Sequence, residues 1–200
     1  MAVEQIVAIC GDGKLRDSSQ CSDQFRRFLS HQKTEKLAEY ARYCLDSKFE
    51  RSGFVLQDVV NEIGRRLAYS VRNGRYSGVT NEIGYDGLWS DGRHFLVIEV
   101  KTTDAYRINL DVICAYGDKV NQAKEVGKDS APYTLIVVGR QDTCDVEAQI
   151  RGSRHAWNVR LISIDALIRL MFVNEELDDA SLTDKIRQVL LPLEYTKVDN

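Results

Sequence analysis

The sequence predicts a mixed α/β fold in a chain long enough for one domain of ordinary size. Along its 200 residues, helical and strand patterns follow one another in the order helices, hairpin, helix, strand, helix, strand, helix. The runs 95–98 and 133–138 are continuously apolar, which is typical of strands buried on both faces of a sheet. We therefore expect antiparallel pairing on one side of the sheet and crossover connections on the other.

The first 50 residues are predicted to form an extension made of a strand and helices. Residues 2–10 have the composition of a first strand, which the glycine-rich turn at 11–13 ends. Over residues 22–45, apolar side chains recur every three or four positions, which predicts a helix with Ser22 as its N-cap. The apolar pattern lapses near His31, so a break is expected there. Residues 51–200 are expected to form the core of the domain together with C-terminal helices.

The core is predicted to contain one hairpin between helices. A helix is expected over residues 55–71, ended by Asn73-Gly74. Strand compositions at 79–89 and 94–102 flank an aspartate-glycine turn, which predicts the hairpin. The remaining expected elements are helices over 110–126 (capped by Gly127), 145–157, 182–190 and one from Ser163 or Asp165 through Phe172, with strands over 133–138 and 159–163.

Composition and charge exclude several classes of protein. With 44% hydrophobic and 28% charged residues, the chain is globular rather than disordered. No run approaches the roughly 18 apolar residues of a membrane span, and no signal peptide is recognisable, so we expect a cytoplasmic protein without a membrane partner. Five cysteines without a C-x-x-C pair and three scattered histidines indicate reduced thiols rather than a zinc site. The net charge of −3 weighs mildly against a constitutive nucleic-acid binder.

The end of the apolar strand at 94–102 carries a charged pair. Side chains alternate along a strand, so Glu99 and Lys101 project from one face and Val100 from the other. Such a pair is costly at the end of a buried strand unless it binds something. The hairpin folds Asp86 back beside this strand. Our hypothesis is that Asp86 and Glu99 converge on one metal ion, with the backbone carbonyl of Val100 as a further ligand.

This set of groups suits the hydrolysis of a phosphodiester bond. Two carboxylates can hold a hard divalent cation such as Mg²⁺, for which Mn²⁺ can substitute, and Mg²⁺ keeps several waters and takes phosphate oxygens. The metal polarises the phosphate and lowers the pKa of its bound water. A lysine beside the carboxylates can contact the phosphate or help to position the attacking water.

Asp86, twelve intervening residues and then Glu99-Val100-Lys101 within a hairpin resemble the PD-(D/E)XK nuclease superfamily, which includes many restriction endonucleases. The resemblance covers roughly residues 55–173 and departs from the motif's name at Tyr85, which replaces the proline. It implies a restriction endonuclease-like core, a mixed sheet flanked by helices. It further implies a magnesium-dependent endonuclease acting on DNA, in a restriction or phage-defence setting.

The resemblance also implies residues around this centre. Several members of the superfamily use a glutamate from the helix before the hairpin, and Glu62 holds the matching position; the alternative is a solvent-facing glutamate. Polar or basic residues on the helix after the motif often face the site or the phosphate. Gln122 and Lys119 are the candidates, and a solvated helix face explains them equally well.

Two groups of basic residues are candidate contacts to the DNA backbone, because arginine suits bidentate phosphate contacts. Solvated surfaces are the simpler explanation of both. The first group is Arg65, Arg66, Arg72 and Arg75, and the second is Arg151, Arg154 and Arg160 with His155 and Trp157.

The sequence leaves partners and rival functions open. One site of this kind cuts one strand at a time, so duplex cleavage favours a homodimer. A partner subunit or a fused specificity domain is the other expected source of recognition. The rival functions are a non-catalytic nucleic-acid-binding or assembly module with this fold, and a nuclease for RNA or for branched structures.

Overall fold

Five strands form a single mixed sheet in the order β1-β2-β3-β4-β5. The computed structural model describes residues 1–47, 49–77, 84–102, 108–123, 132–139 and 143–192. The strands are β1 (Ser70–Asn73), β2 (Gly87–Ser90), β3 (Phe95–Lys101), β4 (Tyr133–Val138) and β5 (Val159–Ser163). The pairs β1–β2 and β2–β3 are antiparallel, whereas β3–β4 and β4–β5 are parallel. The central strand β3 therefore joins an antiparallel half to a parallel half, which is the mixed α/β class expected from the sequence.

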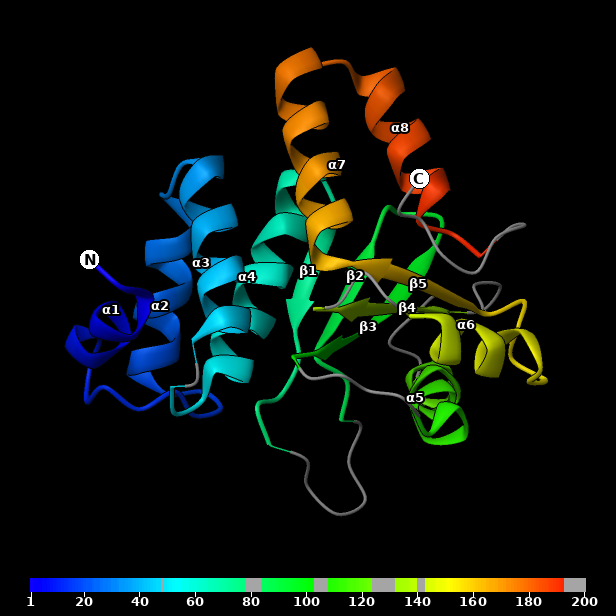
Figure 1. Ribbon diagram of the computed structural model, residues 1–200, viewed down its shortest axis with the longest axis horizontal. Coiled ribbons are helices and arrows are strands. Elements are labelled where there is room, and N and C mark those ends of the chain that lie inside the picture. The colour runs from blue at the N-terminus through cyan, green and yellow to red at the C-terminus, as the bar shows by residue number, and fades with distance from the viewer. Residues whose placement is uncertain (48, 78–83, 103–107, 124–131, 140–142, 193–200) are drawn as a thin grey trace.

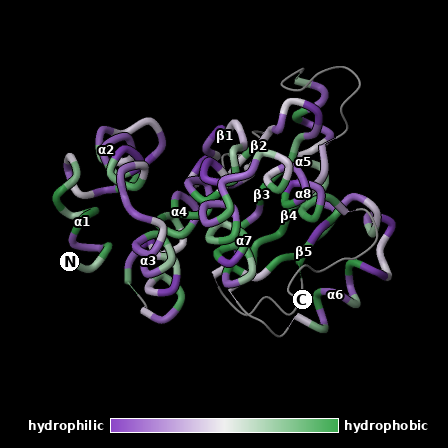
Figure 2. The backbone as a smooth tube through the Cα atoms, turned by 90° about the horizontal axis from the view of Figure 1, so that it is seen from above, coloured by the Kyte–Doolittle hydropathy of each residue, from purple (hydrophilic) through white to green (hydrophobic). Residues whose placement is uncertain are grey.

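Helices cover both faces of this sheet (Figure 1). Their bounds are α1 (Val3–Ile9), α2 (Gln20–Ser30), α3 (Thr34–Asp46), α4 (Ser52–Arg66), α5 (Leu110–Gln122), α6 (Cys144–Arg151), α7 (Ile164–Leu177) and α8 (Ala180–Val189). On one face, α4 and α7 pack with the N-terminal helices against the larger apolar core. On the other face, α5 and α6 enclose two smaller apolar clusters. Figure 2 shows that β3, β4 and β5 are largely hydrophobic.

Several predicted elements are confirmed. The strands at 133–138 and 159–163 have the predicted bounds. The hairpin pairs Ser90 with Phe95 around the predicted turn. The N-terminal helical region breaks between α2 and α3, with His31 as the C-cap of α2. The side chain of Ser163 caps α7 by accepting a hydrogen bond from the backbone N–H of Ala166 at 3.1 Å.

The prediction of a strand over residues 2–10 is wrong, because this segment forms helix α1. Its buried side chains are Val3, Ile6 and Cys10, separated by three and four positions, which is the spacing of one helix face. The next helix begins at Gln20, and Ser19 rather than Ser22 is its N-cap. The Ser19 side chain accepts a hydrogen bond from the backbone N–H of Ser22 at 3.2 Å.

The helix predicted over 55–71 ends earlier, and the strand that follows it was not predicted. Helix α4 stops at Arg66, and Ala68 has a positive φ of 59°, from which the chain turns into β1. The sequence predicted that the helix ends at Asn73-Gly74, because glycine adopts a positive φ more readily than alanine does. Here Gly74 instead follows the last residue of β1.

Other bounds differ in smaller ways. Helix α6 ends at Arg151 rather than at residue 157, and α8 begins two residues before its predicted start. The strand expected at 79–89 is described only from residue 84, and β2 begins at Gly87. The predicted continuation of α5 through Val126 to Gly127 lies outside the described residues.

The N-terminal helices share the larger core with the rest of the chain. One cluster of buried apolar residues runs from Val3 in α1 to Leu191 after α8. None of the five cysteines, all of which lie in the described part of the chain, forms a disulfide. Within the ranges that the structure describes, no helix combines the length and the apolar character needed to cross a membrane.

Candidate active site

Asp86 and Glu99 face each other across the start of the hairpin. Gly87 pairs with Ile98 at the end of the antiparallel β2–β3 ladder, so Asp86 and Glu99 both lie just beyond this last pair. The backbone N–H of Asp86 also donates to the carbonyl of Ile98 at 3.0 Å, whereas the Asp86 carbonyl faces β1 and accepts from the N–H of Gly74, so Asp86 departs from the regular ladder. The register therefore brings together the aspartate and the glutamate of the predicted motif.

The two carboxylates have different hydrogen-bond partners. Asp86 Oδ2 accepts a hydrogen bond from the backbone N–H of Val100 at 2.7 Å. Glu99 Oε1 lies 2.5 Å from Lys101 Nζ. The Glu99 side chain is 10% exposed and that of Lys101 is 35% exposed, so solvent reaches the site from the lysine side. A mostly buried carboxylate pair thus lies beside one cation at the C-terminal end of β3.

Burial and charge set the acidity of this group of residues. Burial, and then the negative charge of Glu99, raise the pKa of Asp86 to about 7, although the Val100 N–H and the Lys101 charge act in the opposite direction. Burial alone would lower the pKa of Lys101, but the hydrogen bond and charge of Glu99 raise it above its ordinary value. The site therefore holds negative charge at a free-energy cost, which a bound cation would reduce.

The carbonyl of Val100 lies on the side of β3 that faces Asp86. In an antiparallel ladder the N–H and C=O of one residue point toward the same neighbouring strand. The N–H of Val100 reaches Asp86, and the carbonyl of Ile98, two residues earlier, also accepts from Asp86. The Val100 carbonyl therefore points toward the Asp86 side of β3, and its role as a metal ligand stays a prediction.

Two carboxylates and a backbone carbonyl are hard oxygen donors that fit Mg²⁺, which binds few protein ligands and retains waters. In the part of the chain that the structure describes, no group of three or more His, Cys, Asp or Glu side chains could hold a metal ion. This set provides fewer protein ligands than a metal site built from protein groups alone. Waters or phosphate oxygens would therefore have to complete the coordination.

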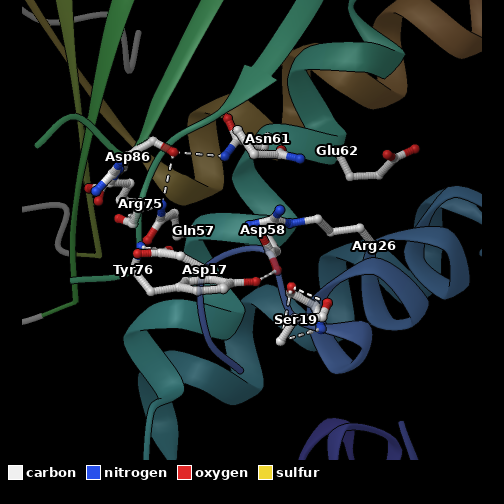
Figure 3. A network of polar contacts seen from close by, with 12 residues as sticks. Asp17, Ser19, Arg26, Gln57, Asp58, Asn61, Glu62, Arg75, Tyr76 and Asp86 are labelled. Atoms are coloured by element: carbon white, nitrogen blue, oxygen red, sulfur yellow. Dashed lines mark hydrogen bonds and ion pairs between the residues drawn. The ribbon is translucent and has the colours of Figure 1, made fainter. Parts of the chain in front are cut away.

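Helix α4 approaches this centre with two buried amides that the sequence analysis did not single out. Gln57 Nε2 and Asn61 Nδ2 donate to the backbone carbonyl of Asp86 at 3.0 and 2.9 Å (Figure 3). Asn61 Oδ1 also accepts from Trp89 Nε1 at 2.9 Å. The sequence did not distinguish them, because Asp58 and Glu62 lie beside them in the same helix and are polar and buried as well.

Glu62 is buried on a different side of α4. Its carboxylate accepts from Arg65 Nη1 and from Arg66 Nε, each at 3.2 Å. Figure 3 shows its side chain extending away from Asp86. The structure therefore does not bring Glu62 together with Asp86 and Glu99, and Glu62 is not the solvent-facing residue of the alternative interpretation either.

Tyr116 is a second residue that the sequence analysis overlooked. A Cβ atom added to Gly84, two residues before Asp86, would lie 3.2 Å from the Tyr116 hydroxyl. Burial raises the pKa of this tyrosine, and the charge of Glu99 adds to the effect. Lys119 lies one turn further along α5 and is exposed, as is Gln122. Tyr116 therefore lies near the carboxylates, whereas Lys119 and Gln122 are exposed on α5.

The first group of candidate DNA contacts is divided between helix α4 and the region of strand β1. Arg65 is engaged with Glu62 and donates to Asn73 Oδ1 at 2.9 Å. Arg72 is exposed on β1, and Arg75 is exposed just after it. Figure 3 places Arg75 beside Asp86, so this arginine lies close to the candidate site.

The second group is divided between surface and interior. Arg154 and His155 both donate to Asp111 Oδ1, at 2.9 and 2.7 Å. Trp157 is 74% exposed, whereas Arg160 is only 4% exposed in β5. The five residues of this group therefore do not form one surface, because Arg160 is buried.

Comparison with protein-family models, with curated proteins and with solved structures finds no match to this chain. The functional argument therefore depends on the geometry of the site itself.

Proposed function

We propose that the chain is a metal-dependent endonuclease of the PD-(D/E)XK type that hydrolyses phosphodiester bonds in DNA. The observation that carries the proposal is the convergence of Asp86 with Glu99 and Lys101 at the end of β3. The mixed sheet with helices on both faces (Figure 1) supports it, because the superfamily resemblance implied a mixed sheet flanked by helices.

Each group has a defined role in this proposal. Asp86 and Glu99, with the carbonyl of Val100, would hold Mg²⁺ or Mn²⁺. The ion supplies charge stabilisation on the phosphate and lowers the pKa of a bound water. Lys101, released in part from Glu99 when a cation shares that carboxylate, donates to a phosphate oxygen or to the attacking water.

The surrounding surface offers contacts for a polyanion. Arg72 and Arg75 are exposed at the edge formed by β1, and Lys119 is exposed on α5. These residues would bind the DNA backbone without reading its sequence. A second copy of the chain would supply the second cut of a duplex, and a partner subunit or a fused domain would supply sequence recognition. A restriction or phage-defence role is the biological setting that the resemblance favours.

Cleavage of supercoiled plasmid in Mg²⁺ or Mn²⁺ tests the proposal. We expect nicking or linearisation by the parent protein, and a loss of at least about a hundredfold in Asp86→Ala and Lys101→Ala, because both groups act at the reacting phosphate. The matched control is Lys36→Ala. Lys36 is also paired with a glutamate at 2.5 Å, but this pair lies on the surface of α3.

Substrate competition separates the rivals. Duplex, single-stranded and branched DNA and RNA of equal length are offered together, and the preferred substrate defines the class of nuclease. A parent protein that binds DNA but cuts none of these substrates in either metal would support the non-catalytic module instead. Equal cutting by Lys101→Ala and the parent would refute the assignment of the site.

A further inference from the structure

We infer that Gln57 and Asn61 are positioning residues, which fix the Asp86 carboxylate for metal binding by holding the backbone of Asp86 from helix α4. This inference rests on the proposed function, because it assigns a role within the same site. Neither amide belongs to the predicted motif, and both donate to the main chain of Asp86 rather than to its carboxylate.

The Asp86 carbonyl accepts three hydrogen bonds. The donors are the backbone N–H of Gly74 at 2.9 Å, Gln57 Nε2 at 3.0 Å and Asn61 Nδ2 at 2.9 Å. A peptide carbonyl has two lone pairs and usually accepts one or two bonds. A third donor is more than satisfaction of a buried carbonyl requires, so this concentration of donors points to a fixed position for the peptide.

The amides are themselves held rigidly. Gln57 and Asn61 are 3% and 1% exposed, four residues apart on one face of α4. Asn61 Oδ1 accepts from the buried indole N–H of Trp89, which fixes the orientation of the amide. The two side chains therefore cannot turn away from Asp86 without leaving buried polar groups unsatisfied.

Close packing removes the remaining freedom next to Asp86. A Cβ atom at Gly87 would lie 2.1 Å from Asn61 Oδ1, so only glycine lets α4 approach the chain this closely. On the other side, the Asp86 N–H donates a hydrogen bond to the carbonyl of Ile98, and Asp86 Oδ2 accepts one from the N–H of Val100. The backbone is thus held by α4, and the side chain by β3.

This arrangement matters because the site provides few ligands. When two carboxylates and one carbonyl must bind an ion, a small displacement of one carboxylate is not compensated by others. Groups that orient metal ligands typically change metal affinity by about 10–100-fold when they are removed. The structure therefore assigns to α4 the task of keeping Asp86 opposite Glu99.

The test measures Mn²⁺ binding to the 200-residue chain without DNA, by electron paramagnetic resonance of free Mn²⁺, together with the Mn²⁺ dependence of plasmid cleavage. Gln57→Met keeps the length of the side chain but removes its donor. Asn61→Asp removes the donor to Asp86 and keeps the acceptor for Trp89. We expect the Mn²⁺ dissociation constant, and the concentration for half-maximal cleavage, to rise about tenfold in each variant.

Asp58→Asn is the matched control, because Asp58 lies on α4, is 1% exposed and bonds to Arg26 and Tyr76 rather than to Asp86. It should lower stability and leave the Mn²⁺ constant unchanged within about twofold. Variants that lose stability but bind Mn²⁺ like the parent would overturn the inference and leave the nuclease proposal intact. If the parent binds no Mn²⁺, both fail. If one variant does not fold, the other decides.

Discussion

At the scale of single residues, Asp86 combines a functional position with an energetic cost. Because its pKa is about 7, the carboxyl of Asp86 keeps its proton up to about pH 7 in the folded chain. In the unfolded chain the same carboxyl loses its proton near its ordinary pKa of 3.8. The cost arises from burial and from the neighbouring Glu99. Sites that gather like charges for a ligand commonly lose stability in the absence of that ligand.

Asp86→Asn is therefore expected to stabilise the metal-free protein at pH 8 while abolishing cleavage. The folded-state pKa lies above the ordinary 3.8, so the contribution of Asp86 to the free energy of unfolding is fully present below about pH 4 and lost as pH rises to about 7. An asparagine cannot ionise and avoids this loss, which we estimate to be on the order of 4 kcal/mol.

Urea unfolding in EDTA between pH 4 and pH 8 measures this effect. The parent and the variant should have similar stability near pH 4 and diverge as the pH rises. A constant difference at every pH would show that ionisation of Asp86 is not the cause. Since a metal ligand must be deprotonated, Mn²⁺ binding to the parent should weaken below about pH 7.

At the scale of elements, α4 is the helix that links the parts of the molecule. Its buried amides reach Asp86, its Asp58 binds Arg26 of α2 and Tyr76 beyond β1, and its Glu62 binds two arginines. A helix with this many buried polar side chains must pack closely against its neighbours. Gly64 permits that contact, because the indole of Trp89 occupies the space where a Cβ atom would lie.

Gly64→Ala is expected to destabilise the protein by about 1–3 kcal/mol, because the new methyl group would overlap the Trp89 ring. The added Cβ atom would lie only 2.5 Å from Trp89 Cε2. Gly53→Ala in the same helix is the matched control. Its nearest neighbour is Thr102 Cγ2 at 3.7 Å, so only the higher helix propensity of alanine remains, and stability should be unchanged or slightly higher.

Chemical denaturation of the two alanine variants gives the comparison directly. Gly64→Ala should also weaken Mn²⁺ binding, because displacement of Trp89 removes the partner that orients Asn61. Equal stability of the two variants would mean that α4 can shift away from β2 without cost.

At the scale of the whole molecule, residues 1–50 are packed into the core of the chain. Phe25 and Leu37 are 0% exposed, as are Val59 and Ile63 of α4, and all four belong to one cluster. The ion pair between Arg26 and Asp58, at 2.9 Å, adds a buried polar link between the N-terminal helices and α4. This arrangement favours one cooperative unit over a separable extension.

Phe25→Ala tests this cooperativity. We expect a loss of about 3–5 kcal/mol in the unfolding of the entire chain, because a large buried side chain is removed from a shared core. Circular dichroism follows all helices, and the fluorescence of Trp89 follows the sheet. Replacing the exposed Trp157 by phenylalanine leaves Trp89 as the sole tryptophan and serves as the background for the measurement.

The two signals should shift together in a single transition. If circular dichroism shows an early partial transition while the Trp89 signal is unchanged, the N-terminal helices unfold independently. The extension would then be a separate unit, as the boundary drawn at residue 50 from the sequence suggested.

The sequence was sufficient where local pattern and burial coincide. The apolar runs of β3, β4 and β5 have no helical period, so their strands were predicted closely. The turn at 90–93 predicted the hairpin and thereby the meeting of Asp86 with Glu99. The alternation of side chains along β3 placed Glu99 and Lys101 together. By contrast, the short segments at 2–10 and 70–73 were misassigned, because few residues carry a weak period in each.

By itself, then, the sequence determined the α/β class, the hairpin and the carboxylates with their lysine, since these depend on contacts between neighbours along a strand or across a tight turn. Only the tertiary structure decided which face of α4 meets the hairpin. A rotation of that helix by about 100° per residue separates Asn61 from Glu62, and packing against Trp89 and Gly87 selects Asn61. That choice depends on side chains distant in sequence, and no local pattern encodes it.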